Sequence, residues 1–399
     1  MKKLFWIFIA SPVLFSARIW AQETVKDTVF LIPFADTVLL DEVVVKAHKT
    51  IPMNNRWSNL QPVDLVTVAG ANGNLYKALE TLPGTQIQGE SGRLLVRGGS
   101  SDETQTYIDG MHVLNPYTST AENTPARGRY SPFMFSGINL STGGHSQEYG
   151  EALSAVLPLE TKDNSRINKV GISPSTVGIG GGGNHAFRNA SLALNLDYQN
   201  LALYNKVYPG RIDFKKPYQM FSGATQFRYT PSGSSVFKIY VGYDRTDYSN
   251  YTDNNRYLFC LGENNVYLNS TFRTAISGGW EWFSGMAYSL FDRKVDGAVT
   301  EGDHWCEKQA ELHFKTKLSK KFHPTFRMDV GFESFLRWYE TRYSQVSVAD
   351  TKEISPTIEA VFGTVSYYPV ENLKAELSFR TEYASLARKI NFSPRLSFS

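Results

Sequence analysis

The second half of the chain alternates between apolar and polar residues with a period of two. In ASLALNLDY, residues 190–198, every second residue is leucine or tyrosine. In SVFKIYVGYD, residues 235–244, Phe237 and Ile239 lie on one face and Lys238 on the other. The same alternation recurs at residues 310–318, 326–339 and 374–383. Because successive side chains of a strand point to opposite faces, the pattern predicts strands with one apolar and one polar face.

These segments are long, about 9–15 residues, whereas strands of soluble sheets usually have about 5–6. A tilted strand that crosses a bilayer needs about 9–11 residues. We therefore predict an antiparallel transmembrane β-barrel, of about a dozen strands, in residues 164–399. A large soluble β-sandwich is the alternative, but it explains the strand length less well. The residues predicted to face lipid include Leu192, Leu194, Phe237, Ile239, Leu377 and Phe379.

Composition and charge agree with a β-rich protein. Aromatic residues make up 14% of the chain, and such residues suit a pleated surface. The net charge of +3 comes from 41 basic and 38 acidic residues. This balance lacks the basic excess typical of nucleic-acid binding, so no nucleic-acid partner is predicted.

Residues 1–21 have the pattern of a secretory signal peptide. Lys2 and Lys3 precede the apolar run LFWIFIASPVLF, and Ala21 offers a small residue at the expected cleavage point. A membrane-anchoring helix is the alternative, but the run contains Pro12 and is shorter than the ~20 residues that such a helix needs. We therefore expect an exported protein.

The chain has two cysteines, Cys260 and Cys306. In an exported protein they could form a disulfide, and the sequence is equally compatible with two free thiols. His304 lies two residues before Cys306, but an isolated His-x-Cys does not make a metal site. No metal site and no cofactor are predicted.

Residues 94–110, LLVRGGSSDETQTYIDG, allow three interpretations: a phosphate-binding loop, a cluster of catalytic carboxylates, or strands joined by tight turns. No Gly-Lys-Ser/Thr follows, which argues against the phosphate loop. No histidine or nucleophile accompanies Asp102, Glu103 and Asp109, so we expect turn and surface carboxylates and no catalytic residues. Gly98 and Gly99 would permit one turn, and Asp109 with Gly110 would form the other.

A second glycine-rich stretch, GIGGGGN at residues 178–184, superficially suits a dinucleotide-binding loop. Strand alternation follows it where that fold requires a helix, so we expect a flexible turn or a kink in the barrel wall. The helix signal of the chain is NGNLYKALETLPG. Its leucines and alanine recur at helical spacing, Asn72 or Asn74 can cap its start, and Pro83 with Gly84 ends it.

The order of these elements resembles the plug domain of TonB-dependent outer-membrane receptors. The resemblance rests on a helix ending in Leu-Pro-Gly, a strand leading into Arg-Gly-Gly, a strand ending in Ile-Asp-Gly, and the later segment FSGINLSTGGHSQEYGEALSAVLPLETKD. It assigns residues 56–163 to an α/β plug domain followed by a transmembrane β-barrel. The plug motif residues are Arg97, Gly98, Gly99, Asp109, Gly110, Tyr149 and Gly150.

Residues 22–55 contain DEVVVKA, at residues 41–47, where the family carries its TonB box. Three successive valines form an extended segment that could add as a strand to the sheet edge of a TonB-type energy-coupling protein. An ordinary edge strand of the plug is the alternative. The predicted partner-binding residues are Asp41, Glu42, Val43, Val44 and Val45.

The resemblance implies a receptor that imports a scarce small ligand, such as an iron chelate, cobalamin or an oligosaccharide, across the outer membrane of a Gram-negative bacterium. A non-transporting binding or adhesion barrel is the alternative. An enzyme would need a nucleophile and a base that the polar faces do not offer. Plugged barrels have ~22 strands, so about a dozen strands would make an incomplete receptor.

The chain departs from the family at one point. Many members carry an arginine before the plug's Tyr-Gly and another shortly after it, where each can pair with carboxylates of the barrel wall. This chain has Glu148 and Ala152 there, so we expect that latch to be missing. Arg97 remains as a candidate partner for carboxylates of the polar barrel face, and the candidate plug-barrel contacts are Glu333, Glu376 and Glu382.

Overall fold

The computed structural model describes residues 57–398, apart from short gaps at 61, 69–70, 72–73, 87–92, 120–127, 163–167, 176, 209–212, 253–256, 346–347 and 371–372. All described residues belong to one unit of the chain, Val45–Ser399. The predicted signal peptide and the predicted TonB box lie outside the described residues. No helix within the described part of the chain is long and apolar enough to cross a bilayer.

The predicted plug contains a five-stranded sheet in the order β1-β6-β7-β4-β5. Strands β4 and β7 run parallel, and the other neighbours are antiparallel. A separate short pair joins β2 to β3. The strands are β1 Trp57–Leu60, β2 Thr85–Gln86, β3 Leu95–Val96, β4 Thr104–Ile108, β5 Met111–Val113, β6 Phe135–Ser141 and β7 Ala155–Thr161.

Two short α-helices, α2 Pro62–Thr67 and α3 Leu75–Leu79, accompany this sheet, together with the 3-10 turns η1 Ser101–Glu103 and η2 Pro132–Met134. Asn74 caps α3, because its side chain accepts a hydrogen bond from the Tyr76 amide. Leu75 and Leu79 are buried, and Gly84, with φ of 86°, follows the helix. The predicted helix and its cap, Asn74, are therefore confirmed, but the helix ends at Leu79, before the expected end at Pro83 and Gly84. Helix α2 was not predicted.

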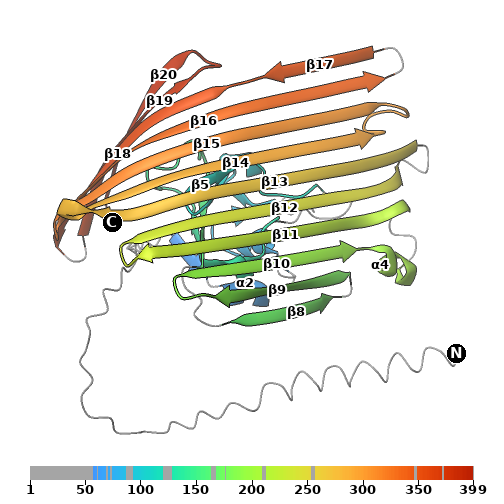
Figure 1. The fold of residues 1–399 in the computed structure, drawn as a ribbon. Helices are drawn as coiled ribbons and strands as arrows, with labels where there is room; N and C mark the ends of the chain where they lie inside the picture. Colours follow the sequence, from blue (N-terminus) through green and yellow to red (C-terminus); the bar gives the residue numbers. More distant parts are fainter. Residues whose placement is uncertain are drawn as a thin grey trace, which may run out of the picture. The chain divides into compact units, whose positions relative to one another are not determined.

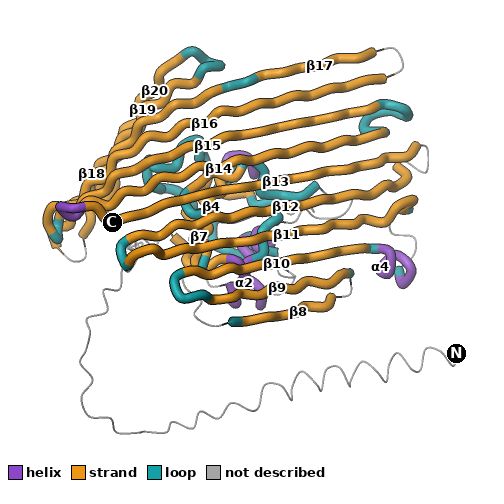
Figure 2. Tube along the Cα trace, in the orientation of Figure 1, coloured by secondary structure: helices purple, strands orange, loops and turns teal. Residues whose placement is uncertain are grey.

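The second region forms one large antiparallel sheet of 13 strands, β8 to β20 (Figures 1 and 2). Strand β17 continues β18 along the same partner, β16, and helix α4 Ala202–Val207 follows β10. The strands are β8 Lys169–Ser175, β9 Gly178–Ala186, β10 Ala190–Asn200, β11 Phe214–Ser232, β12 Ser235–Thr252, β13 Tyr257–Ile276, β14 Trp280–Asp296, β15 His304–His323, β16 Phe326–Gln345, β17 Val348–Ile354, β18 Thr357–Val370, β19 Leu373–Ala384 and β20 Lys389–Phe398. A turn, η3 Ser277–Gly279, joins β13 to β14.

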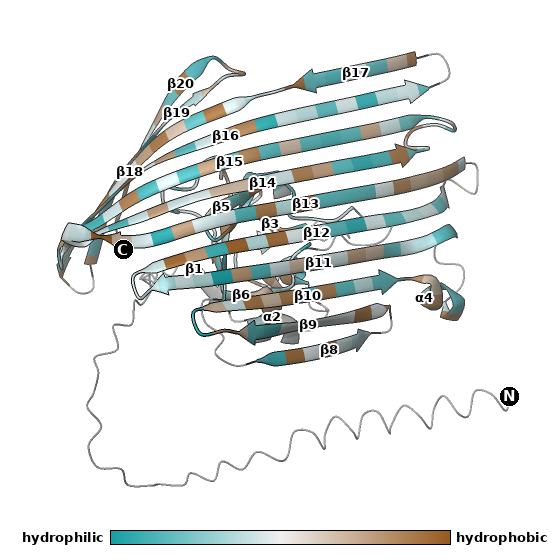
Figure 3. Ribbon diagram, viewed as in Figure 1, coloured by the Kyte–Doolittle hydropathy of each residue, from teal (hydrophilic) through white to brown (hydrophobic). Residues whose placement is uncertain are grey.

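Hydrophilic and hydrophobic residues alternate along the strands of the large sheet (Figure 3), so its two faces differ as the sequence predicts. We call the face that contacts the plug the inner face. Lys238 bonds to the plug from this face, whereas Leu194 and Leu377 on the other face are 44% and 58% exposed. All six residues predicted to face lipid lie on the outer face by this alternation. The predicted facing is confirmed.

The outer face of β15 shows the width of its apolar band. The band lies between Lys308 and Lys320 and consists of Ala310, Leu312, Phe314, Thr316 and Leu318. Twelve residues at ~3.3 Å each and a tilt of ~45° span ~28 Å along the barrel axis. Lys320 lies 5.0 Å from the ring centroid of Trp280, as suits a membrane interface.

Two expectations about the sheet are decided by its register. Residues 178–184 form part of the regular strand β9, so the expected turn or kink is wrong. Glycine is needed there because a Cβ at Gly182 would lie 2.8 Å from the carbonyl oxygen of Leu194. Cys260 and Cys306 are free thiols, since β14 runs between their strands.

Candidate functional site

The plug motif residues build two tight turns. Asp109 and Gly110 have φ of 50° and 84° and join β4 to β5, as a two-residue hairpin with two positive φ angles requires. In the other turn the positive φ angles fall on Arg97 and Gly98. Gly99 was expected to permit this turn, but it is needed because of a close contact with Ser154. A Cβ there would lie 1.7 Å from the Ser154 hydroxyl.

The three carboxylates of this stretch are structural acceptors. Glu103 accepts a 2.8 Å hydrogen bond from the Ser154 hydroxyl, and Asp102 is exposed. Asp109 accepts bonds from the amide and hydroxyl of Thr161, at 3.1 and 2.6 Å. It also pairs with Lys238 of the large sheet, at 3.1 Å. Asp109 thus joins the plug to the inner face.

Several ion pairs and hydrogen bonds join the plug to the sheet at residues 147–151, between β6 and β7. The Glu148 carboxylate pairs with Lys317 at 2.6 Å and with Lys315 at 3.3 Å, both on β15. Burial by itself would raise the pKa of Glu148, but the two ammonium groups outweigh it and hold the pKa at about 2. Glu148 is therefore ionised at neutral pH.

Glu151 makes a second ion pair with the inner face. Both of its carboxylate oxygens accept hydrogen bonds from the Arg337 guanidinium, at 2.9 and 2.5 Å. Glu151 has φ of 57°, a left-handed conformation that costs a non-glycine residue about 1 kcal/mol or more. The two-pronged bond to Arg337 helps to hold the residue in it.

The Tyr149 and Gly150 motif fits between these two ion pairs. Arg380 of β19 passes so close that a Cβ at Gly150 would lie 2.3 Å from its Nη2. Burial raises the pKa of Tyr149 and of Tyr107, so both phenols stay protonated. The Tyr107 hydroxyl donates to the Gly150 carbonyl. The Lys315 ammonium lies 5.2 and 5.7 Å from the centroids of these two rings.

Neither position of the family's latch carries an arginine in this chain, but ion pairs of reversed sign are present beside it. Ion pairs join the plug to the sheet beside the Tyr-Gly motif, but the carboxylates are on the plug and the bases are on the sheet. The reason is chemical: the Coulomb energy of a pair depends on the product of the two charges, so exchanging both signs preserves the attraction.

The expected partners of Arg97 bond elsewhere. Glu333 accepts from Arg380 at 2.8 Å and from His313 at 2.9 Å. Glu376 pairs with Lys374, and Glu382 pairs with Arg380. The prediction that Arg97 pairs with one of these carboxylates is wrong. The three carboxylates bond within the sheet, and two of them, Glu333 and Glu382, bind Arg380, which donates to the Gln147 carbonyl of the plug.

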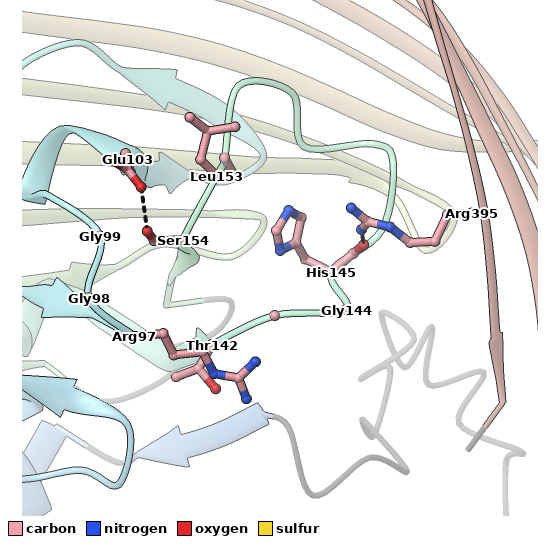
Figure 4. Close-up of a pocket in the computed structure, with 12 residues that line it drawn as sticks. Arg97, Gly98, Gly99, Glu103, Thr142, Gly144, His145, Leu153, Ser154 and Arg395 are labelled. Atoms are coloured by element: carbon pink, nitrogen blue, oxygen red, sulfur yellow. Dashed lines mark hydrogen bonds between the residues drawn. The ribbon is translucent and has the colours of Figure 1, made fainter.

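Arg97 lines a polar cavity of about 440 Å³ between plug loops and β20 (Figure 4). Arg395 reaches in from β20 and donates to the His145 carbonyl. Burial, together with the Arg395 charge, lowers the pKa of His145 to about 4, so that imidazole is neutral at neutral pH. The positive charge in the cavity comes from the guanidinium groups of Arg97 and Arg395. Its carboxylate, Glu103, accepts a hydrogen bond from Ser154.

Further polar contacts join other parts of the plug to the sheet. Arg129 pairs with Asp244 of β12 at 2.7 Å, and Ser119 donates to Glu263 of β13. His112 contacts Glu311 of β15 at 2.6 Å. The sequence could not assign these partners, because each pair joins residues more than a hundred positions apart.

The comparison with known families identifies the N-terminal region. Residues 64–156 match the TonB-dependent Receptor Plug Domain. No curated protein matches the chain by sequence.

Solved structures share the arrangement of plug and sheet. The outer membrane transporter YddB from Escherichia coli aligns with a TM-score of 0.67 and 13% identity, over 86% of this chain and 58% of that one. The copper transporter OprC aligns with a TM-score of 0.66 and 11% identity, over 86% and 61%. A mutant of the ferric enterobactin receptor PfeA from Pseudomonas aeruginosa aligns with a TM-score of 0.65 and 12% identity, over 89% and 61%. This chain thus spans about 60% of their length.

Proposed function

We propose, on the premise that this outer-membrane chain has the plug domain and the fold of TonB-dependent receptors, that it imports a scarce small ligand with energy from a TonB-type complex. The matched structures are described as transporters and receptors. Iron chelates, cobalamin and oligosaccharides are the ligand classes to test. We propose no enzymatic activity.

The observation that carries the proposal is the attachment of the plug. Asp109, Glu148 and Glu151 are each paired with a base on the inner face. Buried or partly buried pairs of this kind cost several kcal/mol to separate, since breaking one leaves uncompensated charge. A ligand passes a plug held in this way only when work is done on the plug. A binding or adhesion barrel would have no need for such work.

The predicted TonB box at residues 41–47 is the proposed point at which that work enters. Strand addition to a partner sheet uses main-chain hydrogen bonds, so it depends on the backbone donors of the segment. Proline removes one donor and fixes φ. Isoleucine retains both the donor and the extended conformation.

Uptake by Val44→Pro and Val44→Ile variants of the full-length receptor tests the proposal. Cells that depend on the receptor are grown on one limiting nutrient: a ferric chelate, cobalamin or an oligosaccharide. We expect Val44→Pro to abolish growth and leave binding of the same nutrient to whole cells unchanged, whereas Val44→Ile grows normally. Normal growth of the proline variant would contradict TonB coupling and favour the non-transporting barrel.

A further inference from the structure

The polar cavity beside Arg97 has the size of a small-molecule site. Its volume is about 440 Å³, and pockets that hold small molecules measure about 300–1,000 Å³. Plug loops form one side of the cavity and β20 contributes Arg395 from the other (Figure 4). The cavity thus lies at the boundary between plug and sheet, and its lining is mainly polar side chains and glycine backbone. Such a lining suits a polar occupant.

The two guanidinium groups of the cavity differ from the other arginines at this boundary. Three of those arginines each pair with a carboxylate: Arg129 with Asp244, Arg337 with Glu151 and Arg380 with Glu333. Within the described part of the chain, neither Arg97 nor Arg395 has a carboxylate partner. Charge that is partly removed from water and left without a counter-charge is unfavourable. The cavity therefore attracts an anion.

The carboxylate in the lining does not satisfy these two groups. Glu103 accepts a 2.8 Å hydrogen bond from the Ser154 hydroxyl, and Figure 4 shows that bond on the opposite side of the cavity from Arg395. One carboxylate against two guanidinium groups leaves a net positive charge. Arg395 bonds to the His145 carbonyl through Nη1, so the other N–H donors of its guanidinium are available to a ligand.

His145 adds an unsatisfied polar atom to the lining. The residue is 5% exposed, and its Nδ1 has no hydrogen-bond partner among the residues that the structure describes. Buried polar atoms in folded proteins nearly always have a partner. We therefore expect a bound molecule to supply one.

The plug backbone fixes the position of the Arg97 guanidinium. Arg97 has φ of 51°, in the tight turn that follows β3. Its Nη1 lies so close to the loop after β6 that a Cβ at Gly143 would come within 2.9 Å of it. The guanidinium is thus held against a glycine and on the plug side of the cavity. Its orientation does not depend on the sheet.

We propose that this cavity binds a small molecule with two or more carboxylate groups, which bridges Arg97 of the plug and Arg395 of the sheet. A guanidinium presents a planar fork of donors that matches a carboxylate. Because the two forks belong to different parts of the protein, a molecule with two carboxylates uses both, whereas a monocarboxylate uses one.

The bridge has a consequence for the plug. The plug and the sheet each contribute one guanidinium, so the complete site exists only while the plug is attached. A ligand that binds one state alone stabilises that state. A bound dicarboxylate should therefore strengthen attachment of the plug. This inference concerns the attachment and does not rest on the proposed TonB coupling.

Binding of succinate to the purified full-length receptor is the first test. The receptor is titrated with succinate by calorimetry, and acetate at the same ionic strength is the probe with a single carboxylate. Equal ionic strength is needed because salt screens the attraction between charges. We expect one succinate per receptor, and acetate should bind about tenfold more weakly or less, since it lacks the second charged contact.

Release of the plug by urea is the second test. The full-length receptor is reconstituted in a planar bilayer, and channel opening is followed with and without succinate. At a free succinate concentration about 100 times its Kd, the ratio of closed to open channels should rise about a hundredfold. Acetate at the same ionic strength should leave this ratio nearly unchanged, which excludes a general effect of salt on stability.

Glutamine variants of three arginines locate the site. Arg97→Gln and Arg395→Gln each remove one charged contact, so each should weaken succinate binding about tenfold or more and abolish most of the effect on plug release. Arg97 is exposed, so its variant should fold, and plug release without succinate checks this. Arg388→Gln is the matched control, because Arg388 is an exposed residue just before β20 and outside the cavity. It should bind succinate as the wild type does.

The proposal is overturned if the wild type does not bind succinate, if acetate binds as tightly, or if Arg97→Gln retains the wild-type affinity. An equal loss in Arg388→Gln would also overturn it, since the attraction would then be a general effect of charge. Failure of transport by the receptor would leave these outcomes unaffected. Conversely, a receptor that does not bind succinate would not disturb the proposed TonB coupling.

Discussion

Removing the charge of Glu148 tests the plug attachment most directly. In Glu148→Gln the side chain keeps its size, but Lys317 and Lys315 lose the carboxylate that lies 2.6 and 3.3 Å from them. The pKa of Glu148 falls from its ordinary 4.5 to about 2. Each pKa unit corresponds to about 1.4 kcal/mol, so the attached plug favours the ionised form by about 3 kcal/mol. We expect the variant to lose about 2–3 kcal/mol of attachment at neutral pH, since the side chain is 18% exposed and partly screened.

The pH dependence has a definite sign. A carboxyl whose pKa is lowered by the attached plug contributes fully above its ordinary value of 4.5, and its contribution is lost as pH falls through about 2. The difference between wild type and Glu148→Gln should therefore be constant near neutral pH. It should disappear only in strong acid.

The assay is urea release of the plug, read as channel opening in a planar bilayer. Lys317→Gln and the double variant complete a mutant cycle, in which contacting residues typically couple by about 0.5–3 kcal/mol. Glu301→Gln, at an exposed loop position of the large sheet, serves as the control and should match the wild type. Additive effects of Glu148→Gln and Lys317→Gln would refute the pair, as would a Glu148→Gln variant that releases its plug at the wild-type urea concentration.

Two further substitutions test the facing of the sheet and the close approach of Arg380. Ile239→Lys, on the outer face, should cost ~2–4 kcal/mol of folding in lipid vesicles. Lys238→Met, on the inner face, removes the partner of Asp109, so it should weaken plug attachment, measured by urea release, and leave folding in lipid nearly unchanged. Equal folding costs would contradict the facing. Gly150→Ala should displace Arg380 and lower the free energy of plug attachment, measured by urea release, by about 1–3 kcal/mol. Gly137→Ala is the control and should have little effect, because its Cβ would meet nothing closer than 3.7 Å.

The sequence predicted those parts of the fold that depend on neighbours along the chain. The alternation of Leu192 and Leu194 with polar residues predicts both a strand and its facing, because the side-chain period of a strand is two. The turn at Asp109 and Gly110 was predictable because few residue pairs adopt two positive φ angles. Helix α2 was missed because six residues are too few to show a helical period.

The ion pairs could not be predicted from the sequence because they depend on residues far apart in the chain. Glu148 meets Lys315 and Lys317 across more than 160 positions, and the register of β14, β15 and β16 decides which inward side chain arrives beside it. The family pattern pointed to arginines on the plug, and that expectation concealed Glu148 as a latch residue. A signal was present in the sequence. The predicted inner face of β15 carries Lys315 and Lys317, two bases that require carboxylates nearby once buried.

The reversed signs make the plug and the sheet a matched pair. Lys315 is fully buried and lies between Glu148 of the plug and Glu333 of the sheet. Its charge is tolerated there only because carboxylates surround it. An arginine in place of Glu148 would set like charges against Lys315 and Lys317, and like charges in a desolvated site repel strongly. The plug segment at residues 147–151 can therefore dock on this inner face with carboxylates but not with bases. The charges of residues 147–151 and of the inner face therefore have to be considered together, because each is compatible only with the opposite charge on the other.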